Sequence, residues 1–197
     1  MNRRMNFLVP TILLAFLLAG TGCSKNTNMF SGITKTTLVV LETTSGPIEI
    51  ELNTDAAPKA ARNFFELVKK GYYNGTVFHR VIRGFMIQGG DPSGSGSGGE
   101  SYWGGLFEDE IKPDVLFDHA GIIAMANHGA NTNGSQFFIT TAARPELNGK
   151  YSIFGEVYSG MEAVRKIEMI PTDKSNDRPM QEQRILKSYI KEYKPGE

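Results

Sequence analysis

The chain has 197 residues, and its 21 basic and 21 acidic residues give a formal net charge of zero at pH 7. This balance argues against electrostatic capture of nucleic acid, and no basic stripe with interleaved aromatic residues is visible. The length suits one domain with an appendage and allows a sizeable core. The 22 glycines and the many short apolar runs favour turn-rich β structure over a helix bundle.

The first 22 residues have the features of a targeting segment. Arg3 and Arg4 precede an apolar run over residues 7–18, which is shorter than the ~20 residues that a membrane span needs. Small residues then lead to Cys23, the only cysteine, so no internal disulfide can form. The pattern resembles a bacterial lipoprotein signal. It predicts removal of residues 1–22 and lipidation of Cys23, which would anchor an exported protein to the periplasmic or extracellular face of a bacterial membrane. The alternative is an ordinary cleaved signal with an incidental cysteine.

After the anchor, residues 23–36 are polar and predict a flexible tether, followed by a domain over residues 37–194. Residues 38–43 and 47–52 predict a hairpin, because isoleucine and leucine alternate with glutamate in its second half. One face of this hairpin is therefore expected to be buried and the other to be exposed to solvent.

Residues 58–70 predict the clearest helix of the chain. Pro58 fits a first helical turn, and Asp55 lies nearby as a candidate cap. The apolar side chains follow the spacing of one helix face, at Ala61, Phe64, Phe65 and Val68. A second helix is predicted over residues 159–168, where Ser159 and Glu162 have the spacing of a capping box.

The stretch FHRVIRGFMIQGGD, residues 78–91, predicts two short strands around a tight turn at Arg83 and Gly84. Alternation along the first strand places Arg80 on one face with Phe78 and Ile82. A guanidinium between apolar residues is unusual, because it cannot lose its hydrogen-bonding partners cheaply. Either its stem packs while its head reaches water, or the charge has a function.

The segment GIIAMANHGANTNGSQFFITT, residues 121–141, contains two further strands. In the second of them Gln136 and Phe138 share one face, and Phe137 and Ile139 share the other, which is expected to be core. With strands over residues 152–157 and 184–193, the chain has about eight strands and two helices. Strands this short and numerous suggest a closed antiparallel barrel.

Other chemistries are disfavoured by the residue patterns. The glycine-rich run 93–105 formally contains GxGxxG, but no βαβ unit surrounds it and no GK[ST] follows, so no nucleotide cofactor is expected. Ser135 lacks the glycine pattern of a nucleophile elbow. The three histidines, His79, His119 and His128, have no metal-ligand spacing, and an isolated histidine is usually a surface or satisfied structural residue. We therefore expect neither a metal nor a cofactor.

The blocks FHRVIxxFMxQGGD and MANxxGxxTNGSQFFI, with the intervening FEDE, resemble the cyclophilin family of peptidyl-prolyl cis-trans isomerases. The resemblance implies a mainly β fold, a closed eight-stranded antiparallel barrel with two capping helices. It also implies rotation about the X–Pro bond, whose uncatalysed barrier is ~18–20 kcal/mol. Twisting the amide leaves a lone pair on the proline nitrogen, so a donor aimed there stabilises the transition state more than the ground state.

The resemblance also assigns roles to residues. It gives catalytic roles to Arg80, as the donor to the proline nitrogen, to Gln88, which would bind the substrate backbone and help to orient Arg80, and to Phe85. The other positions that match the family's substrate site are Met86, Ala126, Asn127, Gln136, Phe138, Leu147 and Tyr151. Two positions depart from many eukaryotic cyclophilins: Glu146 replaces a tryptophan that contacts cyclosporin, and Tyr151 replaces a histidine. The resemblance implies at most weak binding of cyclosporin.

Two functions follow as expectations. The first is a monomeric isomerase that accelerates X–Pro rotation in exported proteins and assists their folding, with proline-containing polypeptide segments as its partners. The second is a binding module that holds such segments without turnover. The set of Arg80, Phe85, Gln88 and Phe138 favours the enzyme, because a pure binder does not need Arg80.

Overall fold

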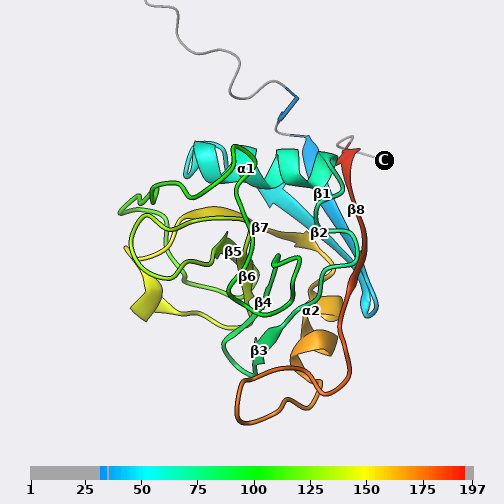
Figure 1. Cartoon of the computed structure of the whole chain (residues 1–197). Coiled ribbons are helices and arrows are strands. Elements are labelled where there is room, and N and C mark those ends of the chain that lie inside the picture. The colour runs from blue at the N-terminus through cyan, green and yellow to red at the C-terminus, as the bar shows by residue number, and fades with distance from the viewer. Residues whose placement is uncertain (1–31, 35, 194–197) are drawn as a thin grey trace, which may run out of the picture.

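A computed structural model of the chain describes residues 32–34 and 36–193. The signal segment 1–22, Cys23 and most of the tether predicted over 23–36 lie outside the described residues. Within them, no helix is long and apolar enough to cross a bilayer. The elements, shown in Figure 1, are β1 (Thr37–Thr43), β2 (Gly46–Leu52), α1 (Pro58–Lys69), β3 (Arg80–Ile82), β4 (Met86–Gly89), β5 (Ile122–Met125), β6 (Phe137–Thr140), a 3-10 turn (Pro145–Leu147), β7 (Ile153–Ser159), α2 (Met161–Glu168) and β8 (Ile185–Glu192).

The eight strands form one antiparallel sheet in the order β3-β4-β6-β5-β7-β2-β1-β8. The predictions of a mainly β fold, eight strands and two helices are confirmed, but the prediction of a closed barrel is wrong. The sheet is open between β3 and β8, where one isolated bridge joins Val77 and Arg184. The physical reason is that β3 has three residues, and the amide of Val81 donates to the carbonyl of Asp177 in the loop before β8.

The main core lies between the sheet and helix α1. Phe64 of α1 contacts the rings of Tyr73, Phe137 and Phe154, with centroid distances of 5.1, 5.2 and 5.1 Å. All four side chains are fully buried. Helix α1 packs against β7 and β8, whereas α2 packs against β2, β3 and β4, so the two helices cover different parts of the sheet (Figure 1).

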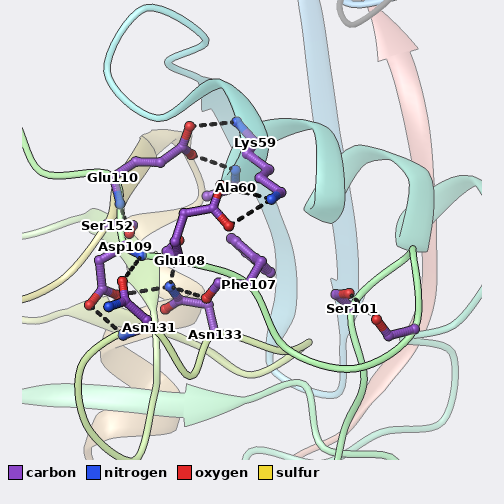
Figure 2. A network of polar contacts seen from close by, with 11 residues as sticks. Lys59, Ala60, Ser101, Phe107, Glu108, Asp109, Glu110, Asn131, Asn133 and Ser152 are labelled. Atoms are coloured by element: carbon purple, nitrogen blue, oxygen red, sulfur yellow. Dashed lines mark hydrogen bonds and ion pairs between the residues drawn. The ribbon is translucent and has the colours of Figure 1, made fainter.

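Helix α1 begins after Ala57, which supplies no side-chain cap, so the sequence-based prediction of Asp55 as the cap is wrong. The cap comes from a residue distant in sequence: the Glu110 carboxylate accepts hydrogen bonds from the amides of Lys59 and Ala60, at 3.0 and 2.8 Å (Figure 2). An anion is stabilised at a helix N-terminus, where unpaired N–H groups point outward. The segment that carries Glu110 is thereby fixed to α1.

The predicted capping box of α2 is also wrong. The N-cap is Gly160, whose φ of 90° lies in the left-handed region, and no side chain caps the helix. The hydroxyl of Ser159 instead donates to the Glu49 carboxylate at 3.0 Å. A Cβ at residue 160 would lie 2.2 Å from the carbonyl oxygen of Pro47, so glycine is required by both conformation and space.

Candidate active site

Arg80, Gln88 and Phe138 occupy directly paired positions on three neighbouring strands. Arg80 of β3 pairs with Gln88 of β4, and Gln88 pairs with Phe138 of β6. Directly opposed residues of an antiparallel sheet point to the same face. The next row, Ile87 paired with Ile139, belongs to the main core. The two faces therefore alternate as the sequence predicted, and the row from Arg80 to Phe138 points away from the main core.

The apolar part of this outward face is a second cluster, separate from the main core. Its buried members include Met86 and Phe138, and four other predicted site residues pack against it while partly exposed: Phe85, Ala126, Leu147 and Tyr151. These residues come from β4 and the turn before it, from β6, from the segment after β5, and from the 3-10 turn and the loop that follows it. The fold therefore brings together positions spread over more than sixty residues of sequence. We call this set the apolar cluster.

Phe138 lies between two aromatic rings of the apolar cluster. Its ring stacks on Phe117 at a centroid distance of 5.8 Å and an angle of 15°, and meets Tyr151 edge-on at 5.4 Å and 85°. The stack fixes the plane of the Phe138 ring. Phe117 was not among the predicted site residues, because it ends a short apolar run between Asp114 and Asp118, in a segment with no strand or helix period.

The polar part of the same face is a cleft of about 410 Å³. Three predicted site residues line it, Arg80, Gln88 and Asn127. The other lining residues were not predicted, and they are His79, Ser95, Gly96, His128, Asn176 and Arg178. The cleft and the apolar cluster meet along the row that joins Gln88 to Phe138.

Asp177 holds the Arg80 guanidinium. The Nε atom of Arg80 donates to Oδ2 of Asp177 at 3.3 Å, and both side chains are part-exposed. Gln88 is the cross-strand neighbour of Arg80, but its amide contacts Gln136 instead. The sequence carried no signal for Asp177, because it lies in a charged loop without periodicity.

A chain of hydrogen bonds connects Gln88 to the glycine-rich loop. The side-chain amide of Gln88 donates to the carbonyl oxygen of Gln136 at 2.9 Å. The amide of Gln136 donates in turn to the backbone carbonyls of Gly96 and Gly98, at 3.0 and 2.9 Å. The orientation of Gln88 therefore depends on the conformation of residues 96–98.

Asp91 organises that loop from inside. Its fully buried carboxylate accepts hydrogen bonds from the amides of Ser93, Gly96 and Gly98, and from the hydroxyls of Ser93 and Ser95. Burial opposes its ionisation, but the donors of Ser93, Gly98 and Gly96 outweigh burial and hold the pKa of Asp91 well below its usual range. The glycine-rich loop is thus a structured wall of the site.

The residues that the sequence assigned to the substrate backbone follow β5. The amide of Ala126 donates to the carbonyl of Gln136 at 2.9 Å. The side-chain amide of Asn127 donates to Asp109 and Asn133, at 3.2 and 3.3 Å, so this side chain is engaged within the protein. Asp109 also accepts from Asn131 and Asn133 (Figure 2). A smaller hollow of about 200 Å³ is lined by residues that include Ala126 and Gln136.

His79 is a buried residue in the wall of the cleft. The side chain is only 7% exposed, and both ring nitrogens are shielded from solvent. Burial, helped by the Arg178 and Arg80 charges and opposed by the nearby Asp91 carboxylate and a hydrogen bond with the Gln136 side chain, lowers the pKa of His79. The imidazole is therefore neutral at pH 7.

The chain matches known proteins over most of its length. Residues 38–190 match the family model described as cyclophilin type peptidyl-prolyl cis-trans isomerase/CLD. Peptidyl-prolyl cis-trans isomerase-like 1 of Neurospora crassa is 54% identical over 152 residues, 77% of this chain and 93% of that protein. Peptidyl-prolyl cis-trans isomerase cypE of Dictyostelium discoideum is 55% identical over 150 residues, 76% of this chain and 95% of that protein.

A solved structure is also similar. The crystal structure of a cyclophilin type peptidyl-prolyl cis-trans isomerase from Cryptosporidium parvum has a TM-score of 0.77 and 46% sequence identity, and covers 80% of this chain and 98% of its own. The structure of that protein in the presence of the dipeptide Ala-Pro has a TM-score of 0.75 and covers 78% of this chain and 98% of its own.

These comparisons correct the predicted location. The relatives are eukaryotic isomerases, not bacterial lipoproteins, so the prediction of an exported protein anchored to a bacterial membrane is wrong. It depended on a short apolar run and Cys23, which lie outside both the family match and the described residues. The matched domain supports a different conclusion: the chain is an enzyme that belongs to the cyclophilin-type peptidyl-prolyl cis-trans isomerases.

Proposed function

We propose that Arg80 accelerates X–Pro rotation by donating a hydrogen bond to the proline nitrogen as the amide twists. The supporting observation is the paired row of Arg80, Gln88 and Phe138 on one face of the sheet. In this row the permanently charged Arg80 lies on one side of Gln88, and the ring of Phe138 lies on the other. A cation at this position stabilises the lone pair that appears on nitrogen only when resonance is lost, which is the condition for catalysis.

In this proposal the proline ring lies against the apolar cluster, with Phe85, Met86 and Phe138 beneath it and Leu147 and Tyr151 at its edge. The partial exposure of Phe85, Leu147 and Tyr151 supports this, since these side chains are accessible to a ligand. The substrate backbone before proline lies along Ala126 and Gln136 and is bound by the main chain of Asn127, whose side chain is engaged with Asp109.

The functional unit of the proposal is the domain over residues 37–194, which the family match over residues 38–190 supports. Its substrates are proline-containing segments of polypeptides that are still folding, because X–Pro isomerisation takes tens to hundreds of seconds uncatalysed and limits folding. Rotation breaks no covalent bond, so the mechanism requires neither a nucleophile nor a metal.

The test compares Arg80→Ala with Arg83→Ala in a proline-peptide isomerisation assay. Arg83 is an exposed arginine three residues away, in the turn between β3 and β4 and outside the cleft. Loss of a donor to developing charge lowers kcat by roughly 10²–10³-fold in other enzymes, and we expect a loss of this order for Arg80→Ala. Arg83→Ala should retain the wild-type rate.

Peptide binding separates the outcomes. Arg80→Ala should still bind a proline peptide measurably, because the apolar cluster remains. An unchanged rate in Arg80→Ala would show that the assigned mechanism is wrong. Binding without turnover in the wild-type domain would instead support a binding module.

Cyclosporin binding is proposed to be weak. Glu146 stands where the resemblance implies a tryptophan that contacts the drug, and its exposed carboxylate lies 3.4 Å from the Arg144 guanidinium. A charged pair offers no flat apolar surface to the drug. Glu146→Trp should therefore increase the sensitivity of the isomerase to cyclosporin, and an unchanged inhibition constant would contradict this explanation.

A further inference from the structure

The cleft continues beyond Arg80 to the loop over residues 172–183, which packs on the edge strand β3. The amide of Val81 donates to the carbonyl of Asp177 at 2.9 Å, and an isolated bridge between Thr172 and Pro179 closes the loop. Arg178 follows directly, and its Nη1 atom donates to the carbonyl of Gly94 at 2.9 Å. The backbone contact of its neighbour Asp177 and its own side-chain contact therefore hold Arg178 between β3 and the glycine-rich loop.

The charges in this part of the cleft are unbalanced. Arg80 is paired with Asp177, but Arg178 makes no ion pair with any residue that the structure describes. The remaining lining residues are neutral amides, a serine, a glycine and two histidines, so no carboxylate lines the cleft. A guanidinium presents five donors, and the Gly94 carbonyl engages one of its nitrogens. Arg178 therefore has donors left for an anion.

The groups behind the cleft wall leave the charge of Arg178 in place. His79 is neutral at pH 7, and it interacts electrostatically with the Asp91 carboxylate as well as with Arg178. Asp91 is not among the lining residues of the cleft, and its carboxylate accepts five hydrogen bonds from the glycine-rich loop. Its charge is therefore engaged inside the loop and not in the cleft.

We propose that Arg178 forms a subsite for the carboxylate of an aspartate or glutamate side chain in the substrate, close in sequence to the isomerised proline. Arg178 supplies both the charge and the hydrogen-bond donors. The proposal rests on the proposed function, because Arg80 at the same cleft places the proline nitrogen. It adds a substrate class to that function: acidic segments around proline are preferred over neutral ones.

The experiment uses matched peptides with acetylated N-termini and amidated C-termini, so that the side chain is the only carboxylate. Glutamate and glutamine are compared at each of the two positions before and after proline. For each pair, kcat/KM is measured by isomerisation and Kd by calorimetry. Because Arg178 is exposed, we expect the glutamate peptide to be favoured roughly two- to fivefold at one or more positions. The preference should shrink in 0.5 M salt.

The variants assign the preference to residues. Arg178→Gln should bring the glutamate-to-glutamine ratio close to one. Lys174→Gln removes an exposed cation from the same loop but outside the cleft, and should keep the wild-type ratio. Circular dichroism checks that both variants are folded.

The outcomes are distinct from those of the Arg80 test. A wild-type ratio close to one at all four positions, in both kcat/KM and Kd, overturns the acidic subsite while turnover of the neutral peptide supports the proposed function. A preference that persists unchanged in Arg178→Gln also overturns it. If the wild-type domain turns over no peptide, the proposed function fails, and the Kd ratio still decides whether the acidic subsite exists.

Discussion

The Nε atom of Arg80 lies 3.3 Å from Oδ2 of Asp177, which joins strand β3 to a loop residue 97 positions later in the chain. The Arg80 and Asp177 side chains are 42% and 38% exposed. An ion pair at this exposure contributes little to folding, ~0–1 kcal/mol. Its effect is on orientation: the Nε atom is engaged on the loop side, and the other two guanidinium nitrogens make no hydrogen bond to the residues that the structure describes, so they can reach the cleft.

Asp177→Asn should lower kcat/KM by roughly two- to fivefold, because an exposed pair of this kind restricts the guanidinium only weakly. The thermal midpoint of unfolding should change little. The measurement is the isomerisation rate of a neutral proline peptide, so that substrate charge does not contribute. A loss of a hundredfold or more would mean that Asp177 takes part in the chemistry, and an unchanged rate would mean that Arg80 needs no orientation.

Phe138 and its sequence neighbour Phe137 allow a test of the two faces of β6. Phe138→Leu alters the apolar cluster and should lower kcat/KM about tenfold, because the loss of a well-fitting apolar contact of this kind changes discrimination by roughly 10–200-fold. Phe137→Leu alters the main core, where Phe137 is fully buried, and should leave kcat/KM unchanged at temperatures where the protein is folded.

Both leucine variants should lower the free energy of unfolding by roughly 0.5–3 kcal/mol, as is usual for substitutions in a packed interior. Urea unfolding measures this loss and gives the conditions for the activity comparison. Equal losses of kcat/KM in the two variants would show that the rate reports general stability and not the outward face of β6.

The period of two along each strand made much of the site predictable from the sequence. Phe138 and Gln136 were separated from Phe137 and Ile139 by alternation alone, and the structure places Phe137 and Ile139 in the main core. Alternation is local, so it is visible in a single segment. The resemblance to cyclophilins supplied the rest of the predicted positions, and Phe85, Met86, Ala126, Leu147 and Tyr151 of these lie in the apolar cluster with Phe138.

Features that depend on contacts between distant segments were not predictable. Closure of the barrel depends on whether β3 and β8 pair, and the loop that carries Asp177 occupies the edge of β3. The cap of α1 was assigned to Asp55, three residues before its start, but it comes from Glu110. The burial of His79 depends on segments distant in sequence, which no local pattern encodes.

Glu110→Ala should destabilise the domain by about 1–2 kcal/mol, the usual loss on removing an N-terminal helix cap. The variant leaves the amides of Lys59 and Ala60 without their acceptor (Figure 2). Glu108→Ala is the matched control: its side chain is 60% exposed and pairs with the Lys59 ammonium at 2.7 Å, so its removal should matter much less. Urea unfolding of the two variants measures the difference, and equal losses would contradict the assignment of Glu110 as the cap.

Asp91→Asn should destabilise the domain at pH 7 and lower kcat/KM, because the loop that accepts hydrogen bonds from Gln136 depends on the Asp91 carboxylate. The folded-state pKa of Asp91 is depressed, since the donors outweigh the burial that opposes ionisation. Its stabilising contribution is therefore complete well above the unfolded-state pKa of about 3.9, and is lost as the pH falls below that value toward the folded-state pKa.

The difference in unfolding free energy between the wild type and Asp91→Asn should accordingly be constant from pH 7 to about pH 5 and shrink by pH 3. Urea titrations at these three values measure it. Ser95→Ala removes one of the donors to Asp91, at 3.1 Å, and should show a smaller difference with the same sign of pH dependence. A difference that grows as the pH falls would show that the buried carboxyl is protonated in the folded protein, and that the glycine-rich loop is held by other contacts.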